Sequence, residues 1–108
     1  MIVSVQMIEH HDKNIFRQVR IPDTTDIRDI LDSTFQYGQN DVCNVPGLYS
    51  VSVGDIVDHG GEKYLILSVG FHKFDQYEYE YYLLITPDQR YAASFFIYDN
   101  VSQSSPAG

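Results

Sequence analysis

The chain has 108 residues, enough for one domain around one hydrophobic core. Fifteen acidic residues against seven basic ones give a formal net charge of −8, which argues against a domain whose main task is gripping nucleic-acid phosphates or anionic membranes. The lone cysteine excludes an internal disulfide, and neither a signal peptide nor an apolar run of about 20 residues is present, so we expect a cytoplasmic protein without membrane contact.

The first 21 residues have the pattern of a β-hairpin. Residues 2–8 alternate along the chain, with Val3, Val5 and Met7 on one side, as in a strand with one buried face. A polar turn follows, and residues 15–21 predict the second strand.

Residues 25–37 predict the only helix of the chain. Its apolar stripe follows the spacing i, i+3, i+4, i+7 and i+8 and consists of Ile27, Ile30, Leu31, Thr34 and Phe35. Asp23 or Thr24 can cap the free N–H groups, and Asp26 then lies in the first turn, near the positive end of the helix dipole. Gly38 is a natural C-terminal stop.

The rest of the chain is predicted to be rich in strands. Gly, Asn, Asp and Pro-Gly residues indicate an ordered loop at residues 38–50. Further strands are expected at residues 51–57, 64–71, 77–86 and 91–98, with tight turns at residues 58–61 and 87–90. We expect residues 1–101 to form a single domain and residues 102–108 to be a disordered tail.

One helix against six or seven strands predicts an α+β fold. The glycine-rich turns favour an antiparallel sheet rolled into a partly open small β-barrel, or a strongly curved sheet, with one packed α-helix. At the corner between two strands, Gly54 is expected to adopt a conformation that a Cβ atom disfavours. The neighbouring Asp55 is expected to accept hydrogen bonds from nearby backbone N–H groups.

No pattern of catalytic or metal-binding residues is present. The segment His10-His11-Asp12 has ligand-type side chains, but they point in different directions on a turn, and no His or Cys spacing typical of zinc occurs. Cys43 is predicted to be a buried or half-buried structural thiol. We therefore expect no enzyme activity, no cofactor and no metal site.

The segment Tyr77-Glu78-Tyr79-Glu80-Tyr81-Tyr82 is the most partner-like feature. In a strand, alternate residues would share a face, which places three tyrosines on one side and both glutamates with Tyr82 on the other. One interpretation is a tyrosine-rich interface, since tyrosine gives a large contact area at low entropic cost. The other is a core face backed by a solvated edge of glutamates.

Three linked motifs carry a resemblance to a known group of proteins. They are F-x-Y-G-Q-N-D at 35–41, S-V-S-V-G-D-I-V at 50–57 and Y-x-I-x-S-V-G-F at 64–71. The chain resembles a family of short uncharacterised proteins of bacteriophages, plasmids and other mobile elements. This resemblance implies a mobile-element origin and no established activity. The motif residues to which we assign a structural role are Gly38, Gln39, Asn40, Asp41, Gly54, Asp55 and Gly70.

Two functions remain open. The first is an accessory, non-enzymatic module whose acidic surface binds a host or mobile-element protein. Where that partner itself binds nucleic acid, the acidic surface would act by imitating the charges of a duplex. Its expected contact residues are Asp26, Asp29, Asp32, Glu78, Tyr79, Glu80 and Tyr82. The alternative is a small β-barrel that binds single-stranded nucleic acid. The net negative charge of the chain disfavours this alternative. Its aromatic and basic cluster is Tyr64, Phe71, His72, Lys73 and Phe74. Association of identical copies through an exposed strand edge also stays open.

Overall fold

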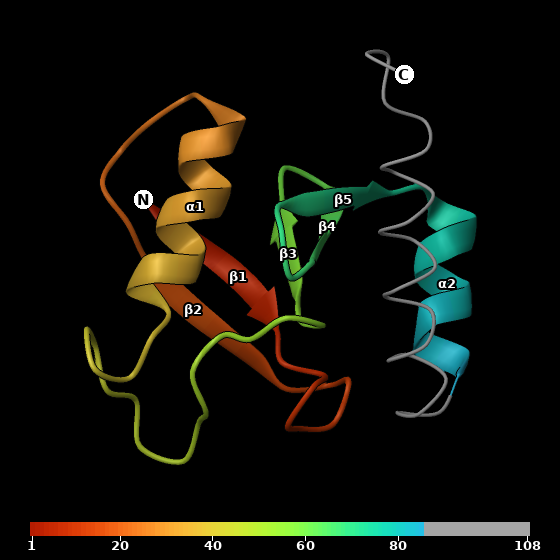
Figure 1. Ribbon diagram of the computed structural model, residues 1–108, viewed down its shortest axis with the longest axis horizontal. Coiled ribbons are helices and arrows are strands. Elements are labelled where there is room, and N and C mark those ends of the chain that lie inside the picture. Colours follow the sequence, from red (N-terminus) through yellow and green to blue (C-terminus); the bar gives the residue numbers. More distant parts are fainter. Residues whose placement is uncertain (86–108) are drawn as a thin grey trace.

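The structure is a computed structural model, and it describes residues 1–85 (Figure 1). In this part of the chain five strands form one antiparallel sheet in the order β2-β1-β3-β4-β5, and two helices pack on it. In chain order, the elements are β1 (Ile2–Gln6), β2 (Phe16–Arg20), α1 (Ile27–Tyr37), β3 (Ile56–His59), β4 (Glu62–Ile66), β5 (Phe71–Phe74) and α2 (Gln76–Leu84).

The two helices cover opposite faces of the sheet. Successive side chains of a strand point to opposite faces, and β3 shows the consequence. Val57 belongs to a buried cluster with Ile30 of α1, whereas its neighbour Ile56 belongs to a second cluster with Tyr82 of α2. In Figure 1 the strands β3–β5 accordingly lie between α1 and α2. The described part of the protein is thus three layers with two separate cores.

The predicted hairpin and the predicted first helix are confirmed. Strands β1 and β2 pair in antiparallel register, and the alternating residues of β1 lie in the core. In α1 the stripe is buried at Ile30, Leu31 and Thr34, while Ile27 is 39% exposed. The helix ends at Gly38, as expected.

The N-terminal cap of α1 differs from the prediction. Asp26 is the cap itself, because its carboxylate accepts hydrogen bonds from the backbone N–H groups of Arg28 at 2.8 Å and Asp29 at 3.4 Å. The proposed caps lie outside the helix. The Thr24 hydroxyl accepts a hydrogen bond from the Asp26 N–H group, and Asp23 pairs with the N-terminal ammonium group at 2.6 Å.

The expected barrel-like sheet is wrong. Within residues 1–85 the sheet is open, with β2 and β5 at its two edges. The physical reason lies in the predicted strand at 64–71, which is two strands joined by a tight loop. The chain turns at Gly70, whose φ of +81° suits a residue without a Cβ atom. Its carbonyl accepts a hydrogen bond from the Leu67 N–H group at 3.1 Å, so β5 folds back along β4 instead of extending a curved strand.

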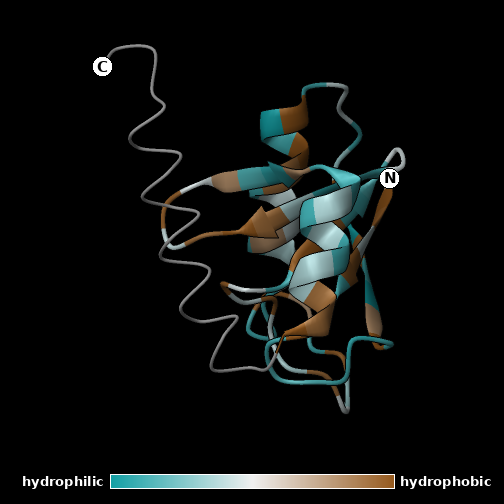
Figure 2. Ribbon diagram, turned by 90° about the vertical axis from the view of Figure 1, so that its right-hand side faces the viewer, coloured by the Kyte–Doolittle hydropathy of each residue, from teal (hydrophilic) through white to brown (hydrophobic). Residues whose placement is uncertain are grey.

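The predicted strand at 77–86 is also wrong, because α2 occupies this part of the sequence. The helix begins with a capping box: Asp75 accepts a hydrogen bond from the Glu78 N–H group at 2.7 Å, and Glu78 accepts one from the Asp75 N–H group at 3.0 Å. Tyr79 and Tyr82, three residues apart, face the sheet. Figure 2, with α2 toward the viewer, shows no apolar band along the helix before its last turn.

Several predictions concern residues that the structure does not describe. The turn at 87–90, the strand at 91–98 and the tail at 102–108 lie outside the described residues, as does the C-terminal limit of the proposed domain. Among residues 1–85, neither helix has the length and apolar character needed to cross a membrane.

Candidate functional site

The Gly54–Asp55 corner is a structural site, as predicted. Gly54 has a φ of +99°, and a Cβ atom there would lie 2.6 Å from Oε2 of Glu9. The Asp55 side chain is fully buried, and its two oxygens accept hydrogen bonds from the backbone N–H groups of Glu9 and Ser52, both at 2.9 Å. Burial raises the pKa of this carboxyl group to about 6, although both hydrogen bonds lower it. Both oxygens are occupied by the protein's own backbone, so the corner fastens loops together.

A buried arginine that the sequence analysis missed organises the loop at 38–50. Arg17 is 2% exposed, and its guanidinium group donates to the Asn40 side-chain oxygen at 2.8 Å, the Tyr49 carbonyl at 2.9 Å and the Cys43 carbonyl at 2.7 Å. Burial lowers the pKa of Arg17. The available signal was its position in β2, where it shares the inward face with Val19.

The Gly-Gln-Asn-Asp motif serves the same loop. The Gln39 side-chain amide donates to the Phe35 and Val51 carbonyls, both at 2.8 Å, which joins the end of α1 to the segment before β3. The Asn40 amide donates to a loop carbonyl as well, and Asp41 is exposed. Cys43 is exposed, so its prediction as a buried or half-buried thiol is wrong. Gln39 and Asn40 of the motif therefore hold the two ends of the loop together through hydrogen bonds to its backbone.

A groove runs between α1 and the loop that joins β4 to β5, and we call it the α1 groove. Its main hollow has a volume of about 620 Å³, and it is lined by Ile27, Arg28, Leu31, Asp32, Tyr64, Leu67, Val69, Gly70, Phe71 and Lys73. A second hollow of about 220 Å³ shares Asp32, Leu67, Gly70 and Phe71 with the first and adds Phe35, Val53 and Ser68. The four shared residues place the two hollows next to each other beside the helix.

The lining of the α1 groove is mainly apolar and partly open to solvent. Helix α1 contributes one apolar residue from each of three successive turns, namely Ile27, Leu31 and Phe35. Opposite the helix, Val69 in the β4–β5 loop is 68% exposed, and Val53 is 41% exposed. These side chains give the groove apolar surface that a bound molecule would remove from water.

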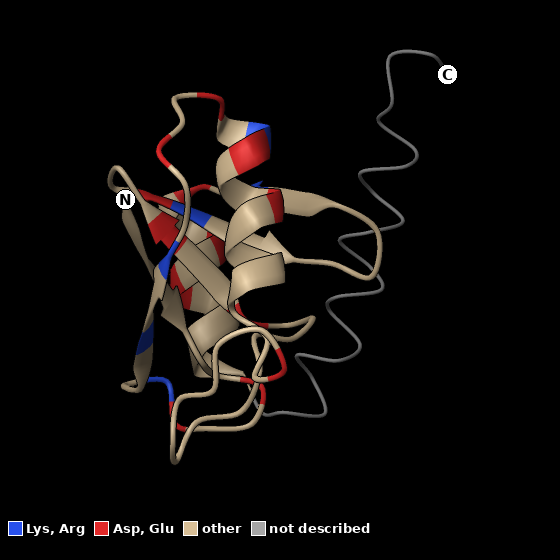
Figure 3. Ribbon diagram, turned by 90° about the vertical axis from the view of Figure 1, so that its left-hand side faces the viewer, with Lys and Arg blue, Asp and Glu red and all other residues tan. Residues whose placement is uncertain are grey.

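Three charged side chains also line the α1 groove. Arg28 and Lys73 line only the main hollow, whereas Asp32 lines both hollows. The Lys73 ammonium group lies 3.6 Å from Glu62, and both side chains are about half exposed, at 60% and 48%. Figure 3 shows the charged positions of α1 gathered toward its N-terminal end.

The residues predicted to form one acidic docking face do not lie together. Asp29 and Asp32 are exposed on α1, whereas Glu78 and Glu80 belong to α2 on the other side of the sheet (Figure 1). Asp26 is engaged as the cap of α1. The three-layer architecture therefore divides the predicted acidic face into two separate groups.

The two tyrosines of the predicted docking face make hydrogen bonds within the protein. Tyr82 is 1% exposed, and its hydroxyl donates to the Gly54 carbonyl at 3.0 Å. The Tyr79 hydroxyl donates to the Gln6 side-chain oxygen at 2.8 Å. A partner on the surface cannot reach the ring of Tyr82, so its assignment as a contact residue is wrong.

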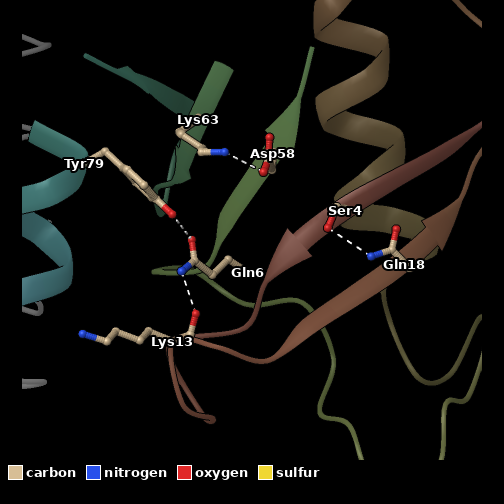
Figure 4. A network of polar contacts seen from close by, with 7 residues as sticks. All are labelled: Ser4, Gln6, Lys13, Gln18, Asp58, Lys63 and Tyr79. Carbon is tan, nitrogen blue, oxygen red and sulfur yellow. Dashed lines mark hydrogen bonds and ion pairs between the residues drawn. The ribbon is translucent and has the colours of Figure 1, made fainter. Parts of the chain in front are cut away.

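Separate groups of polar contacts lie on the sheet between Tyr79 and strand β2 (Figure 4). Gln6 donates to the Lys13 carbonyl at 2.7 Å, and Lys63 of β4 pairs with Asp58 of β3 at 2.6 Å. Within residues 1–85 no buried polar side-chain atom lacks a hydrogen-bond partner. On this face, therefore, no buried side-chain group of residues 1–85 is left for a ligand to satisfy.

The cluster expected for nucleic acid is split by strand alternation. Tyr64, Phe71 and Lys73 line the α1 groove. Phe74 packs with α2 in the other core, and the His72 ring lies 3.0 Å from the Glu78 carboxylate on that side. Arg28, which the sequence analysis did not assign to any site, joins the three groove residues. Its helical position gave no sign that the strands would come to lie beside it.

Within residues 1–85 no group of three or more His, Cys, Asp or Glu side chains is placed to hold a metal ion. The chain was also compared with models of protein families, with curated proteins and with solved structures, and none of them matches it. The α1 groove is therefore the candidate site on geometric grounds alone.

Proposed function

We propose that this protein is a non-enzymatic binding module that docks a segment of another protein in the α1 groove. The observation that carries the proposal is the exposed apolar lining, above all Val69, which is 68% exposed directly opposite α1. Covering such side chains contributes about 25 cal/mol per Å² of apolar surface removed from water. From the resemblance of its motifs, we further propose an accessory role on a mobile element, with a host or mobile-element protein as the partner.

The shape of the groove favours a polypeptide segment over a compact small molecule. The lining follows three successive turns of α1, through Ile27, Leu31 and Phe35, so the depression is extended along the helix. Grooves of this kind take amphipathic segments whose apolar side chains recur at regular spacing. The acidic residues Asp29 and Asp32, on the exposed side and rim of α1, then influence the association rate and its salt dependence.

The experiment uses a displayed library of random peptides selected on the purified full-length protein. We expect enriched peptides with two or three apolar residues, because the groove offers apolar surface on both of its walls. Their affinity for the variant Val69→Asp should fall by about tenfold or more, which corresponds to about 1.4 kcal/mol.

The matched control is Leu84→Asp on α2, because Leu84 is 80% exposed and lies on the opposite side of the sheet. This variant should bind the selected peptides as the wild type does. If no peptide is enriched, or if both substitutions weaken binding equally, the groove is not a docking site for protein segments.

A second candidate function has one specific observation in its favour. Tyr64 and Phe71 line the same hollow as Arg28 and Lys73, which combines rings for stacking bases with cations for phosphates. A fluorescent oligothymidine titrated against the protein at low salt tests this candidate. Binding that disappears in Phe71→Ala, together with an empty peptide selection, would favour nucleic acid over protein as the occupant.

A further inference from the structure

We propose that the α1 groove selects apolar segments that carry an acidic residue, and that the acid's carboxylate binds between Arg28 and Lys73. This inference rests on the docking role proposed above and adds the chemistry and orientation of the partner. It follows from the placement of charge around the main hollow.

Two of the basic side chains of an acidic protein line one hollow. Elsewhere in residues 1–85, Arg17 is buried against carbonyl groups, and Lys63 is paired with Asp58 at 2.6 Å. Arg28 makes no ion pair with any of the described residues. Its planar guanidinium group can bind a carboxylate through two parallel hydrogen bonds.

Lys73 is able to change its partner. Its contact with Glu62 is long, at 3.6 Å, and both side chains are about half exposed. Exposed pairs of this kind contribute about 0–1 kcal/mol, so a carboxylate brought in beside Arg28 can replace Glu62 at little cost. The exposed N-terminal N–H groups of α1 do not supply the site, because Asp26 already caps them. The preference for an anion therefore comes from the two side chains.

Asp32 gives the groove a direction. It lies where the two hollows meet, so it repels a second acidic residue placed farther along the groove. Discrimination of this kind comes from disfavouring the wrong partner as well as from binding the right one. The expected segment therefore has its acidic residue at the Arg28 and Lys73 end and apolar or basic residues near Asp32.

The test compares one selected peptide with its Glu→Gln or Asp→Asn counterpart on four forms of the full-length protein. These forms are the wild type, the double variant Arg28→Gln/Lys73→Gln, Lys73→Gln alone and the control Arg20→Gln. Arg20 is exposed on β2 and does not line the groove, so its substitution removes a positive charge without touching the site.

On the wild type, the acidic peptide should bind about tenfold more tightly than its amide counterpart, and the difference should shrink as salt is raised because screening weakens exposed charge pairs. The double variant should bind both peptides alike, while Arg20→Gln should keep the tenfold preference. Lys73→Gln alone should keep part of it.

Three results would overturn the inference. The first is a selected peptide set without acidic residues, and the second is an equal loss of preference in Arg20→Gln. If either occurs while Val69→Asp still abolishes binding, the docking role stands and only the anionic preference fails. The third is binding of oligothymidine, but of no peptide, through Arg28 and Lys73, which would replace a protein partner with a nucleic acid.

Discussion

The carboxylate of Asp55 accepts a hydrogen bond from the backbone N–H group of Glu9 at 2.9 Å, which ties the corner before β3 to the segment that follows β1. The corner leads into β3 and the other segment leaves β1, and these two strands pair with each other in the sheet. The same corner is also held by α2, because Tyr82 of this helix donates to the carbonyl of Gly54 at 3.0 Å. One two-residue corner therefore connects α2 and the segment after β1 to the start of β3.

Replacing Asp55 should destabilise the protein more than replacing an acid in a half-exposed ion pair. Asp55→Ala leaves the N–H groups of Glu9 and Ser52 without their acceptor, and we expect a loss of about 2–4 kcal/mol in the free energy of unfolding. Asp58→Ala, which removes a partly exposed pair with Lys63, should cost about 1 kcal/mol or less. Urea denaturation measures both, and similar losses would contradict the central role of the corner.

Stability should depend on pH through Asp55. Its folded pKa of about 6 lies above its ordinary value of 3.8, so the folded state binds the proton more tightly than the unfolded state. The resulting stabilisation is fully present below about pH 3.8 and is lost as the pH rises through about 6.

The measurement compares the wild type with Asp55→Asn, since the nearby groups Glu9 and His10 are present in both proteins and their contributions largely cancel. Between pH 5 and pH 7 the stability of the wild type relative to the variant should fall, with a slope of at most about 1.4 kcal/mol per pH unit. A difference that stays constant over this range would mean that the buried carboxyl group titrates as in an unfolded chain.

The buried stripe of α1 should be sensitive to truncation. Ile30 is 3% exposed and packs in the core beside β1 and β3, so Ile30→Ala should cost about 2–5 kcal/mol. Gln36 is exposed on the same helix, and Gln36→Ala should change stability by about 0.5 kcal/mol or less. Thermal or urea unfolding of the two variants would contradict the packing of α1 if their effects were equal.

The tyrosines of α2 should separate into a structural and a silent group. Tyr82→Ala removes a buried ring and should cost about 3–5 kcal/mol. Tyr82→Phe keeps the ring and removes the hydroxyl that donates to Gly54, which should cost about 1 kcal/mol. Tyr81 is 57% exposed, so Tyr81→Ala should be nearly silent. A larger loss of stability for Tyr81→Ala than for Tyr82→Ala would contradict the helix and favour a strand in which alternate tyrosines share a face.

The sequence predicts those elements in which one periodicity dominates. In β1, alternation places Val3 and Val5 in the core, and in α1 the helical spacing is sustained over three turns. In α2 the letters alternate between tyrosine and glutamate, which imitates a strand although the segment is helical. The signal that outweighs this alternation is the pair Asp75 and Glu78, three residues apart, which forms the capping box.

The α1 groove could be predicted only in part. The spacing of Ile27, Leu31 and Phe35 indicates an apolar stripe, but it cannot show that part of this stripe stays uncovered. That depends on where β4 and β5 lie, and their position follows from the turn at Gly70 rather than from anything in the helix. Arg28 becomes a site residue only through this long-range arrangement.

The exposed thiol of Cys43 gives the protein a single natural attachment point for a spectroscopic probe. Arg17 holds the Cys43 carbonyl at 2.7 Å, so the backbone beneath a maleimide-linked dye or a nitroxide is anchored while the sulfur faces solvent. Because Cys43 does not line the α1 groove, such a label can follow a docking event by fluorescence anisotropy or by distance measurement without an engineered cysteine.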